Sequence, residues 1–349
     1  MSAAAAAAVA GPVLDVRDLH VEFDTYGGIV KAVRGASFSV AAGKTLAIVG
    51  ESGCGKSVSV QSIMGLIPMP PGRITAGTAL LDGVDIIRQK VVDGDDVRGN
   101  RIGMIFQDPM SSLNPTMKVG AQIAETLQVH RGLSAQRAHT RAVELLALTN
   151  IPEAERRAEQ YPFAFSGGML QRAMIAIAIA CEPQVLIADE PTTALDVTIQ
   201  AQILDLLKEL QRKVGMAIVL ITHDLGVVAR MADEVAVMYA GEIVEHGTAD
   251  DVFYGAAHPY TVGLRAAMPS KDTSREAGLR PIEGAPPDLF APPPGCAYFA
   301  RCPYAMALCE QRHPPSFAVS GHHRARCWLN HADAPPRAPL QRGGKQWRR

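Results

Sequence analysis

Apolar residues are grouped along this chain in a way that predicts alternating strands and helices. Short runs that are apolar at nearly every position, at residues 45–49, 185–188 and 217–221, predict strands that are buried on both faces. Between the last two runs, residues 198–213 have the spacing of an amphipathic helix. Strands that alternate with helices favour an α/β fold with a mostly parallel core sheet.

Other regions depart from this alternation. Short, partly alternating segments at residues 13–16, 20–23 and 31–40 predict an antiparallel β subdomain at the N-terminus. Apolar positions in residues 119–158 recur at helical spacing, which predicts a helical insertion. Six prolines in residues 281–295 predict an extended linker ahead of a small Cys-rich C-terminal module. The predicted boundaries are a disordered N-terminus at 1–11, a main domain at 12–270, a helical subdomain within it at about 110–172, a linker at 271–295, the Cys-rich module at 296–330 and a basic tail at 331–349.

A glycine-rich loop follows the apolar run at residues 45–49. It reads Gly50-Glu51-Ser52-Gly53-Cys54-Gly55-Lys56-Ser57, which has the phosphate-loop pattern G-x-x-x-x-G-K-S. In this pattern backbone amides surround phosphate oxygens, the lysine contacts the β- and γ-phosphates, and the serine hydroxyl binds Mg²⁺. A helix that begins near Lys56 would point its positive end at the same anion. We therefore predict that the loop binds a nucleoside triphosphate.

Polar residues that end the buried strands predict what happens to that nucleotide. Asp189 and Glu190 follow the run at 185–188, where open α/β sheets bind ligands, so we expect Asp189 to bind Mg²⁺ and Glu190 to act as general base. His223 follows the run at 217–221 and would contact the γ-phosphate.

Three further residues have two interpretations each. Gln107 ends an apolar strand, where its amide would orient water and touch Mg²⁺, or where it would serve only as a turn residue. Phe23 and Tyr26 precede the phosphate loop, and either ring would stack on a base or pack within a strand.

Length and charge narrow the class of protein. The 349 residues suffice for about two domains, and the formal net charge of −1 provides no global basic field for nucleic acid. No apolar run approaches the ~18 residues of a spanning helix, and the alanine-rich start lacks the basic region of a signal peptide. We therefore expect a cytosolic chain that reaches a membrane only through a partner.

Cysteines are concentrated near the C-terminus. Four of the six are Cys296, Cys302, Cys309 and Cys327. A cytosolic chain keeps cysteines as thiols or metal ligands rather than disulfides, and this spacing lacks the C-x₂-C of most zinc sites. The four residues would hold a [4Fe–4S] cluster, bind zinc together with nearby histidines, or remain unligated. Those histidines are His313, His322 and His323.

Two more motifs lie between those already described. Phe165-Ser166-Gly167-Gly168-Met169 precedes an apolar helix, and Ala194-Leu195-Asp196 follows the paired carboxylates. With these, the chain resembles the nucleotide-binding subunit of an ATP-binding cassette (ABC) transporter, a P-loop NTPase. The corresponding family motifs are a Walker A loop at 50–57, a Q-loop at Gln107, a signature at 165–169, a Walker B strand at 185–190, a D-loop at Ala194-Leu195-Asp196 and an H-switch at His223.

The resemblance implies the roles of individual residues. It implies hydrolysis of ATP with Mg²⁺ held by Ser57, Gln107 and Asp189, and it assigns adenine stacking to Phe23. It also implies a sandwich dimer in which the signature residues contact the ATP of the partner subunit; these residues are Ser166, Gly167 and Gly168. The signature departs from the common L-S-G-G-Q at its first and last positions.

The C-terminal region narrows the family further. Gly295-Cys296-Ala297-Tyr298-Phe299, Arg301-Cys302-Pro303-Tyr304-Ala305 and His258-Pro259-Tyr260-Thr261 are similar to segments of the D-type ATPases of oligopeptide and dipeptide importers. Some members of that family carry a [4Fe–4S] cluster on the four cysteines named above. The resemblance implies a peripheral protein on the cytoplasmic face of the inner membrane. It would pair with a paralogous ATPase under two permeases, supplied by an extracytoplasmic peptide-binding protein.

Three alternatives remain open from the sequence. Closely similar ATPases serve importers of nickel and other small solutes, and the ATPase does not touch the solute. A soluble ABC ATPase that acts on nucleic acid would need a basic face, which the charge balance disfavours. A regulatory module that senses iron or redox state through its cysteines is the third.

Overall fold

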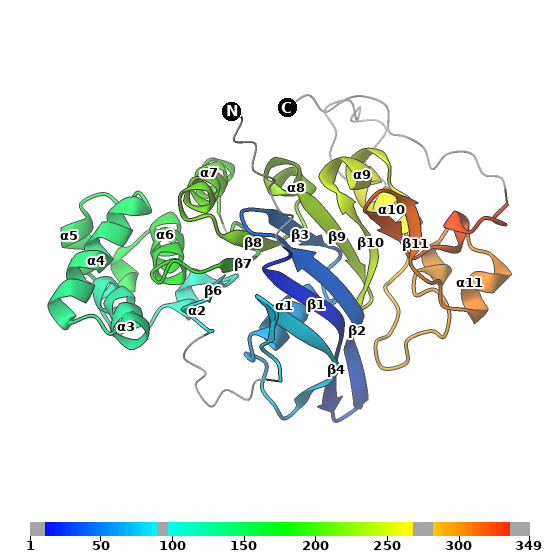
Figure 1. The fold of residues 1–349 in the computed structure, drawn as a ribbon, viewed down its shortest axis with the longest axis horizontal. Coiled ribbons are helices and arrows are strands. Elements are labelled where there is room, and N and C mark those ends of the chain that lie inside the picture. The colour runs from blue at the N-terminus through cyan, green and yellow to red at the C-terminus, as the bar shows by residue number, and fades with distance from the viewer. Residues whose placement is uncertain (1–10, 89–96, 194, 268–281, 336–349) are drawn as a thin grey trace, which may run out of the picture. The chain divides into compact units, whose positions relative to one another are not determined.

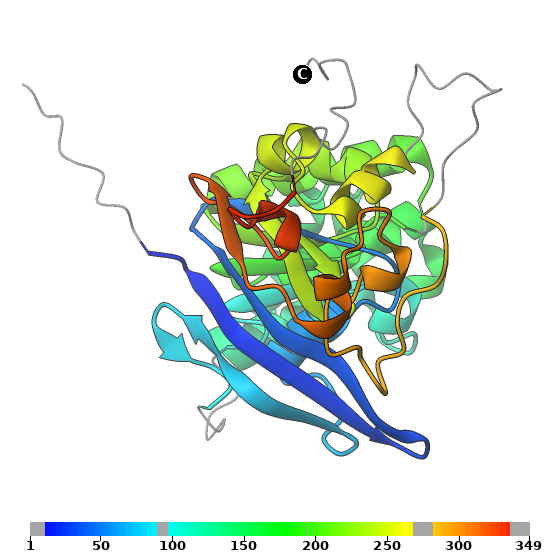
Figure 2. The ribbon, with the colours of Figure 1, turned by 90° about the vertical axis from the view of Figure 1, so that its right-hand side faces the viewer.

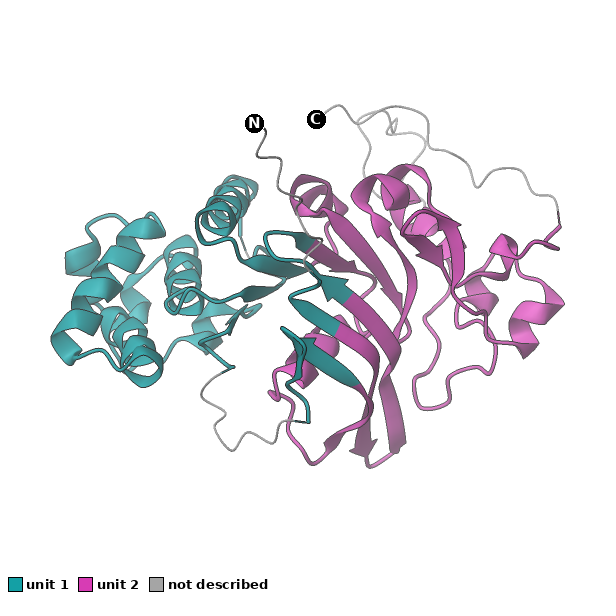
Figure 3. Ribbon diagram, viewed as in Figure 1, with its two compact units in different colours: residues 1–15, 39–45, 78–221 teal, residues 16–38, 46–77, 222–349 magenta. Residues whose placement is uncertain are grey.

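The computed structural model describes residues 11–88, 97–193, 195–267 and 282–335. The predicted disordered N-terminus (except residue 11), Ala194 of the D-loop, much of the predicted linker and most of the basic tail lie outside these residues. The chain divides into two compact units (Figure 3). Unit 1 contains residues 1–15, 39–45 and 78–221, and unit 2 contains residues 16–38, 46–77 and 222–349.

Parallel strands form the centre of unit 1. In this group β7 (Val185–Asp189) lies between β6 (Ile102–Ile105) and β8 (Ala217–Ile221) and pairs with both. Every residue of the three strands is buried. This burial explains why their sequences are continuously apolar and confirms the predicted parallel core.

Helices make up most of residues 109–214 of unit 1 (Figure 1). They are α2 (Pro109–Ser112), α3 (Val119–Arg131), α4 (Ala135–Leu148), α5 (Ala154–Ala158), the 3₁₀ helix η2 (Pro162–Ala164), α6 (Gly167–Ala178) and α7 (Val197–Val214). Helices α3 to α6 pack against one another. Their apolar positions, such as Ile123 and Leu127 of α3 and Leu145 of α4, are buried, which confirms the predicted helical insertion.

Unit 2 contains a mixed sheet. β3 (Thr45–Val49) pairs in parallel with β9 (Glu234–Tyr239), and β9 pairs antiparallel with β10 (Glu242–Thr248). Two C-terminal strands continue the sheet, since β12 (His323–Ala325) pairs with β10, and β11 (Phe317–Ser320) pairs with β12. Strands β11 and β12 were not predicted from the sequence, because they have only four and three residues.

A second sheet has the order β2-β1-β4-β5. Its strands are β1 (Leu14–Thr25), β2 (Gly28–Val40), β4 (Gly72–Leu81) and β5 (Val84–Asp85). The sequence predicts two short strands where β1 is continuous. The difference arises at Asp18, whose φ of 48° places two exposed residues in succession and interrupts the alternation of apolar and polar positions.

Unit 2 also contains short helices, several of which face the viewer in Figure 2. The helices are α1 (Lys56–Ile63), α8 (Leu225–Met231), α9 (Ala249–Tyr254), α10 (Pro259–Ala266), α11 (Ala307–Gln311) and the 3₁₀ helices η3 (Phe299–Arg301) and η4 (Trp328–Asn330). Tyr239 of β9 lies 4.5 Å from Tyr260 of α10 and 5.3 Å from Tyr298, between ring centroids. These rings attach the Cys-rich region to the core of the unit. None of the helices in the described residues combines the length and apolar character needed to cross a membrane.

Candidate functional site

The phosphate loop requires glycine at two positions because other backbone segments approach it closely. It connects β3 to α1 in unit 2. A Cβ atom on Gly50 would lie 2.1 Å from the carbonyl oxygen of Met238, and one on Gly55 would lie 2.5 Å from that of Ala32. Gly55 also has a φ of 102°, which L side chains rarely adopt. The loop is therefore packed tightly against the strands beneath it.

Lys56 lies inside the loop that precedes it. Its Nζ donates to the carbonyl oxygens of Gly50, at 2.8 Å, and Glu51, at 2.9 Å, and the residue is 6% exposed. Both acceptors are neutral, so they orient the ammonium without neutralising its charge. A buried positive charge held this way suits an anionic ligand such as phosphate.

Cys54 is a structural member of the loop. Its backbone carbonyl accepts a hydrogen bond of 2.9 Å from Gly241, and its side chain is buried. Burial raises the pKa of the Cys54 thiol, although the nearby Lys56 acts in the opposite direction. The thiol is therefore neutral and unreactive at neutral pH.

Glu51 is anchored to residues far along the chain. Its backbone N–H donates to the hydroxyl of Tyr260 at 2.8 Å. Its carboxylate accepts two hydrogen bonds from Arg301, at 2.7 and 3.0 Å. The phosphate-loop pattern leaves this position variable, so sequence analysis had no signal for these contacts.

Contacts with a nucleotide were predicted for Phe23 or Tyr26 and for His223, all in unit 2, and they stay predictions. Phe23 is half-buried in β1, and its ring would lie 3.1 Å from a Cβ on Gly72. Tyr26 is fully exposed. His223 is exposed and lies just before Asp224, whose side chain caps α8 by accepting from the N–H groups of residues 226 and 227.

In unit 1 the structure brings together predicted residues at the end of β7. Glu190 Oε2 accepts a hydrogen bond from Gln107 Nε2, at 3.3 Å, and another from Thr193 Oγ1, at 2.9 Å. Asp189 is the last residue of β7 and is 3% exposed. Thr193 was missed in the sequence analysis, because a threonine after two carboxylates carries no signal of its own.

The backbone at Glu190 is strained. Its φ of 47° lies in the left-handed region, which costs a non-glycine residue about 1–2 kcal/mol. Its N–H donates to the carbonyl of Ile221 at 2.9 Å, which holds this conformation. Strain of this kind is concentrated at functional sites, where it fixes the direction of a side chain.

The signature residues form the start of α6. Ser166 is the N-cap, and its hydroxyl accepts from the N–H of Met169 at 3.4 Å. Ser166 and Gly167 are exposed, and nothing lies within 4 Å of a Cβ on Gly167. Asp196 of the D-loop caps α7 in the same way, by accepting from the N–H groups of Thr198 and Ile199.

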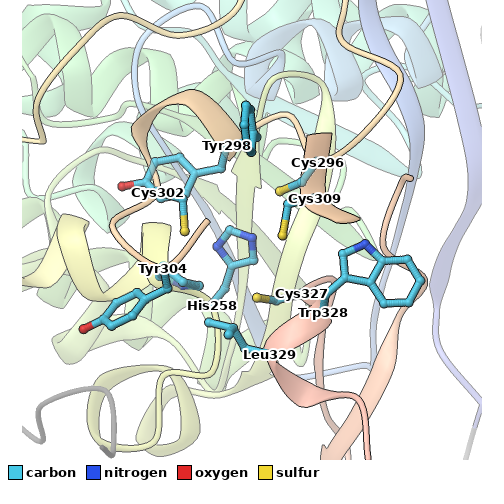
Figure 4. Close-up of a pocket in the computed structure, with 11 residues that line it drawn as sticks. His258, Cys296, Tyr298, Cys302, Tyr304, Cys309, Cys327, Trp328 and Leu329 are labelled. Atoms are coloured by element: carbon cyan, nitrogen blue, oxygen red, sulfur yellow. The ribbon is translucent and has the colours of Figure 1, made fainter. Parts of the chain in front are cut away.

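In unit 2 the four C-terminal cysteines line one pocket (Figure 4). They share it with His258, Tyr298, Tyr304, Trp328 and Leu329, among others. The backbone N–H of Cys296 donates to the carbonyl of Cys309 at 2.7 Å. A Cβ on Gly295 would lie 2.2 Å from that carbonyl, so only glycine allows the two cysteine segments to approach this closely. All four are free thiols.

Burial raises the pKa of three of these thiols, those of Cys296, Cys302 and Cys327, and so favours their protonated form. It raises the pKa of Cys296 to about 11 and that of Cys327 to about 12. His258 is 1% exposed, and its Nδ1 accepts a hydrogen bond from the N–H of Tyr260 at 3.1 Å. Its Nε2 is buried without a hydrogen-bond partner, and burial lowers the pKa of the ring to about 4.

Two of the three histidines that could bind zinc, His313 and His323, have other contacts. His313 Nε2 lies 2.8 Å from Glu242, and His323 Nε2 lies 2.7 Å from Glu245. In the part of the chain that the structure describes, no group of three or more His, Cys, Asp or Glu side chains has the arrangement to hold a metal ion.

Comparisons with known proteins match both regions described above. The family model of the ABC transporter matches residues 33–193, and the model of the oligopeptide/dipeptide transporter C-terminal region matches residues 244–309. The oligopeptide transport ATP-binding protein OppD of Bacillus subtilis is 57% identical over 326 residues, which cover 93% of this chain and 91% of that protein. This chain belongs to the ATP-binding proteins of the oligopeptide and dipeptide ABC transporter family.

Further relatives agree with this family. The dipeptide transport ATP-binding protein DppD of B. subtilis is 54% identical and covers 91% of this chain and 94% of its own length. The solved dimeric structure of the ATP-binding cassette MJ0796 bound to ADP and Pi has a TM-score of 0.60 and 28% identity, over 68% of this chain and 98% of that chain. The resemblance found in the sequence is thus confirmed. The protein is an ABC ATPase, and the family implies ATP and Mg²⁺ as its ligands.

Proposed function

We propose that this chain is the ATP-hydrolysing subunit that energises import of dipeptides and oligopeptides across the cytoplasmic membrane. The observation that carries the ATPase role is the oriented Glu190 carboxylate at the end of β7, held by Gln107 and Thr193. The peptide cargo is supported by the relatives, which are oligopeptide and dipeptide transport ATP-binding proteins, and by the C-terminal family match at residues 244–309.

Each residue of the ATP site has a proposed role. Lys56 binds the β- and γ-phosphates, for which its loop-bound ammonium is suited. Ser57, Asp189 and Gln107 would hold Mg²⁺, which neutralises phosphate charge when bound. Glu190 accepts the proton of the attacking water. The remaining proposed contacts to ATP are the backbone of residues 50–55, the ring of Phe23 and the imidazole of His223.

Hydrolysis would require a second ATPase subunit. The exposed start of α6 presents Ser166, Gly167 and Gly168, and a helix N-terminus of this kind binds anions. We propose that these residues, with Asp196, face the ATP of a paralogous partner. The dimeric cassette among the structural relatives supports such pairing. The two subunits would bind two permeases at the cytoplasmic face of the inner membrane, with an extracytoplasmic binding protein delivering the peptide.

The transport role can be tested with an assembled transporter in proteoliposomes. We expect ATP-dependent uptake of a labelled dipeptide or oligopeptide and no uptake of Ni²⁺, the cargo of the main alternative. Uptake of Ni²⁺ without peptide uptake would contradict the proposed cargo and leave the ATPase role intact. Salt-sensitive binding of DNA by the isolated chain would instead favour the nucleic-acid class.

We also propose that a [4Fe–4S] cluster is held by Cys296, Cys302, Cys309 and Cys327. Their side chains would have to move together on loading, since the described residues contain no group of side chains already arranged to hold a metal ion. The support is chemical: four free thiols and one unpartnered buried N–H line the same pocket. When bound, the cluster would cross-link a region in which few apolar side chains are fully buried. Because at least two of the thiols have pKa values of about 11 and 12, ligation must release protons, so loading should weaken as the pH falls.

Metal analysis tests this site directly. We expect protein purified without oxygen to contain about four iron atoms and to absorb visible light as Fe–S proteins do. Removal of iron by a chelator should lower the melting temperature, because the cross-link is lost. A Cys302→Ala variant should lose iron, whereas Cys181→Ala, at a buried cysteine outside the pocket, should keep it. Zinc instead of iron, or no metal, would contradict the proposed cluster.

A further inference from the structure

Glu51 of the phosphate loop is held at three points. Its N–H donates to Tyr260, its carboxylate pairs with Arg301, and its carbonyl accepts from Lys56 Nζ at 2.9 Å. Tyr260 and Arg301 follow Glu51 by 209 and 250 residues. A residue inside the loop is thus connected on one side to the C-terminal region and on the other to the lysine proposed to bind phosphate.

Arg301 is itself rigidly placed. Beyond its two bonds to Glu51, it donates to the carbonyls of Glu283, at 2.9 Å, and Ile282, at 3.2 Å, and to the Tyr239 hydroxyl, at 3.3 Å. Its side chain is 5% exposed. The bidentate hydrogen bonds to Glu51 raise the pKa of the Arg301 guanidinium above its ordinary value, although burial acts in the opposite direction. Such a fork fixes both the distance and the orientation of the carboxylate.

We propose that Arg301 is a positioning residue for ATP binding, through which the C-terminal region fixes the conformation of the phosphate loop. Loss of the guanidinium would leave the Glu51 carboxylate without its fork and free the backbone to move. The carbonyl that orients Lys56 would move with it. Arg301 also precedes Cys302. A change in the four-cysteine pocket would therefore shift Arg301 and then Glu51, and would alter the binding of the phosphates. This inference rests on the proposed role of the loop in binding ATP.

Nucleotide affinity provides the test. We expect Arg301→Ala to raise the Kd and KM for ATP about tenfold, with a much smaller change in kcat at saturating ATP. Arg301→Lys should recover part of the affinity, because lysine keeps the charge and loses the fork. The control is Arg312→Ala, at an exposed arginine of the same region, which should bind ATP as the wild type does.

A double mutant separates positioning from general damage. We expect Glu51→Gln to weaken ATP binding as well, and the Glu51→Gln/Arg301→Ala pair to be no weaker than the worse single variant, because both disrupt one interaction. If Arg301→Ala does not fold, Glu51→Gln alone still tests the contact, since it leaves the C-terminal region unchanged. Wild-type affinity in Arg301→Ala, or additive effects in the pair, would overturn the inference. Failure of the wild-type chain to bind ATP would overturn the proposed function as well.

A second inference comes from the unpartnered nitrogen of His258. Because Nδ1 accepts from Tyr260, the neutral ring carries its proton on Nε2, and that N–H is buried in the four-cysteine pocket (Figure 4). A buried donor without an acceptor is costly, and the nearby atoms of the pocket are largely sulfur and carbon. We infer that the His258 N–H donates to a sulfur atom of the group that the cysteines ligate. The inference rests on the proposed cluster.

The reduction potential of the loaded protein tests this role. His258→Asn can still cap α10 by accepting from Tyr260, but it cannot place a donor where Nε2 lies. We expect this variant to retain iron and to have a more negative reduction potential, because a hydrogen bond that favours the reduced cluster is lost. The matched control is His331→Asn. His331 Nδ1 accepts from the N–H of Asp333 at 3.1 Å in the same local motif, but His331 does not line the pocket.

The outcomes distinguish the two hypotheses. Equal potentials in iron-loaded wild type and His258→Asn would overturn the role of His258 and leave the cluster standing. A wild-type protein that binds no iron would overturn both. If His258→Asn lost iron and His331→Asn kept it, His258 would be needed to hold the pocket together. That result would overturn the proposal that His258 affects only the reduction potential.

Discussion

Glu190→Gln is expected to bind ATP with wild-type affinity and to hydrolyse it about 10³-fold more slowly, the typical contribution of a general base. The amide oxygen of glutamine can still accept from Gln107 and Thr193, so the side chain should keep its position. What it loses is the ability to take a proton from water. Single-turnover hydrolysis by the assembled transporter, measured beside equilibrium ATP binding, separates the two effects.

A suitable control is available in the same unit. Glu182 is an exposed glutamate that also has a positive φ, of 50°, and it lies 3.2 Å from Arg141. Glu182→Gln therefore reproduces the chemical change and the backbone conformation without a proposed role in hydrolysis. Rapid turnover by Glu190→Gln would remove Glu190 as the base, and slow turnover by both variants would point to a general loss of structure.

Gly50→Ala should lower ATP affinity by about 100-fold, as expected when binding groups are displaced by about 1 Å. The new Cβ would lie 2.1 Å from the Met238 carbonyl and 2.8 Å from Cys54 Sγ, so the loop must move away from β9. The displacement would carry the Gly50 carbonyl, which orients Lys56. Equilibrium binding of ATP and thermal unfolding would measure the two consequences.

Gly215→Ala is the matched control for this substitution. Gly215 has a φ of 75°, but nothing lies within 4 Å of its Cβ position. Its replacement should cost about 1 kcal/mol of stability for the left-handed backbone alone and leave ATP affinity unchanged. If Gly50→Ala bound ATP as tightly as Gly215→Ala, the close packing of the loop would have no part in binding.

Much of the fold follows from local sequence. The apolar runs at 185–188 and 217–221 become buried strands because strands covered on both faces cannot carry polar side chains. The phosphate loop can also be predicted from the sequence, since its glycines are needed for close backbone approach and its lysine for charge. The hydrogen bond between Gln107 and Glu190 was not predicted, because the sequence shows only that each residue follows an apolar strand.

Other features depend on contacts between distant residues. Strands β11 and β12 are short, and they form because β12 bonds to the edge of β10 and β11 bonds in turn to β12. Arg301 gives no signal in the sequence as a partner of Glu51, because either residue alone is an ordinary charged position. The lack of a hydrogen-bond partner for His258 Nε2 could not be predicted either, because it depends on which atoms surround the ring.

The link between Glu51 and Arg301 has a consequence for how the protein is made. On a ribosome that adds about 5–20 residues per second, roughly 12–50 seconds separate the synthesis of the two residues, which are 250 positions apart. During that interval the nascent cassette has its glycine-rich loop but not the arginine that fixes it. A chain released early, before residue 301, would carry every nucleotide motif and still lack the last support of its phosphate loop.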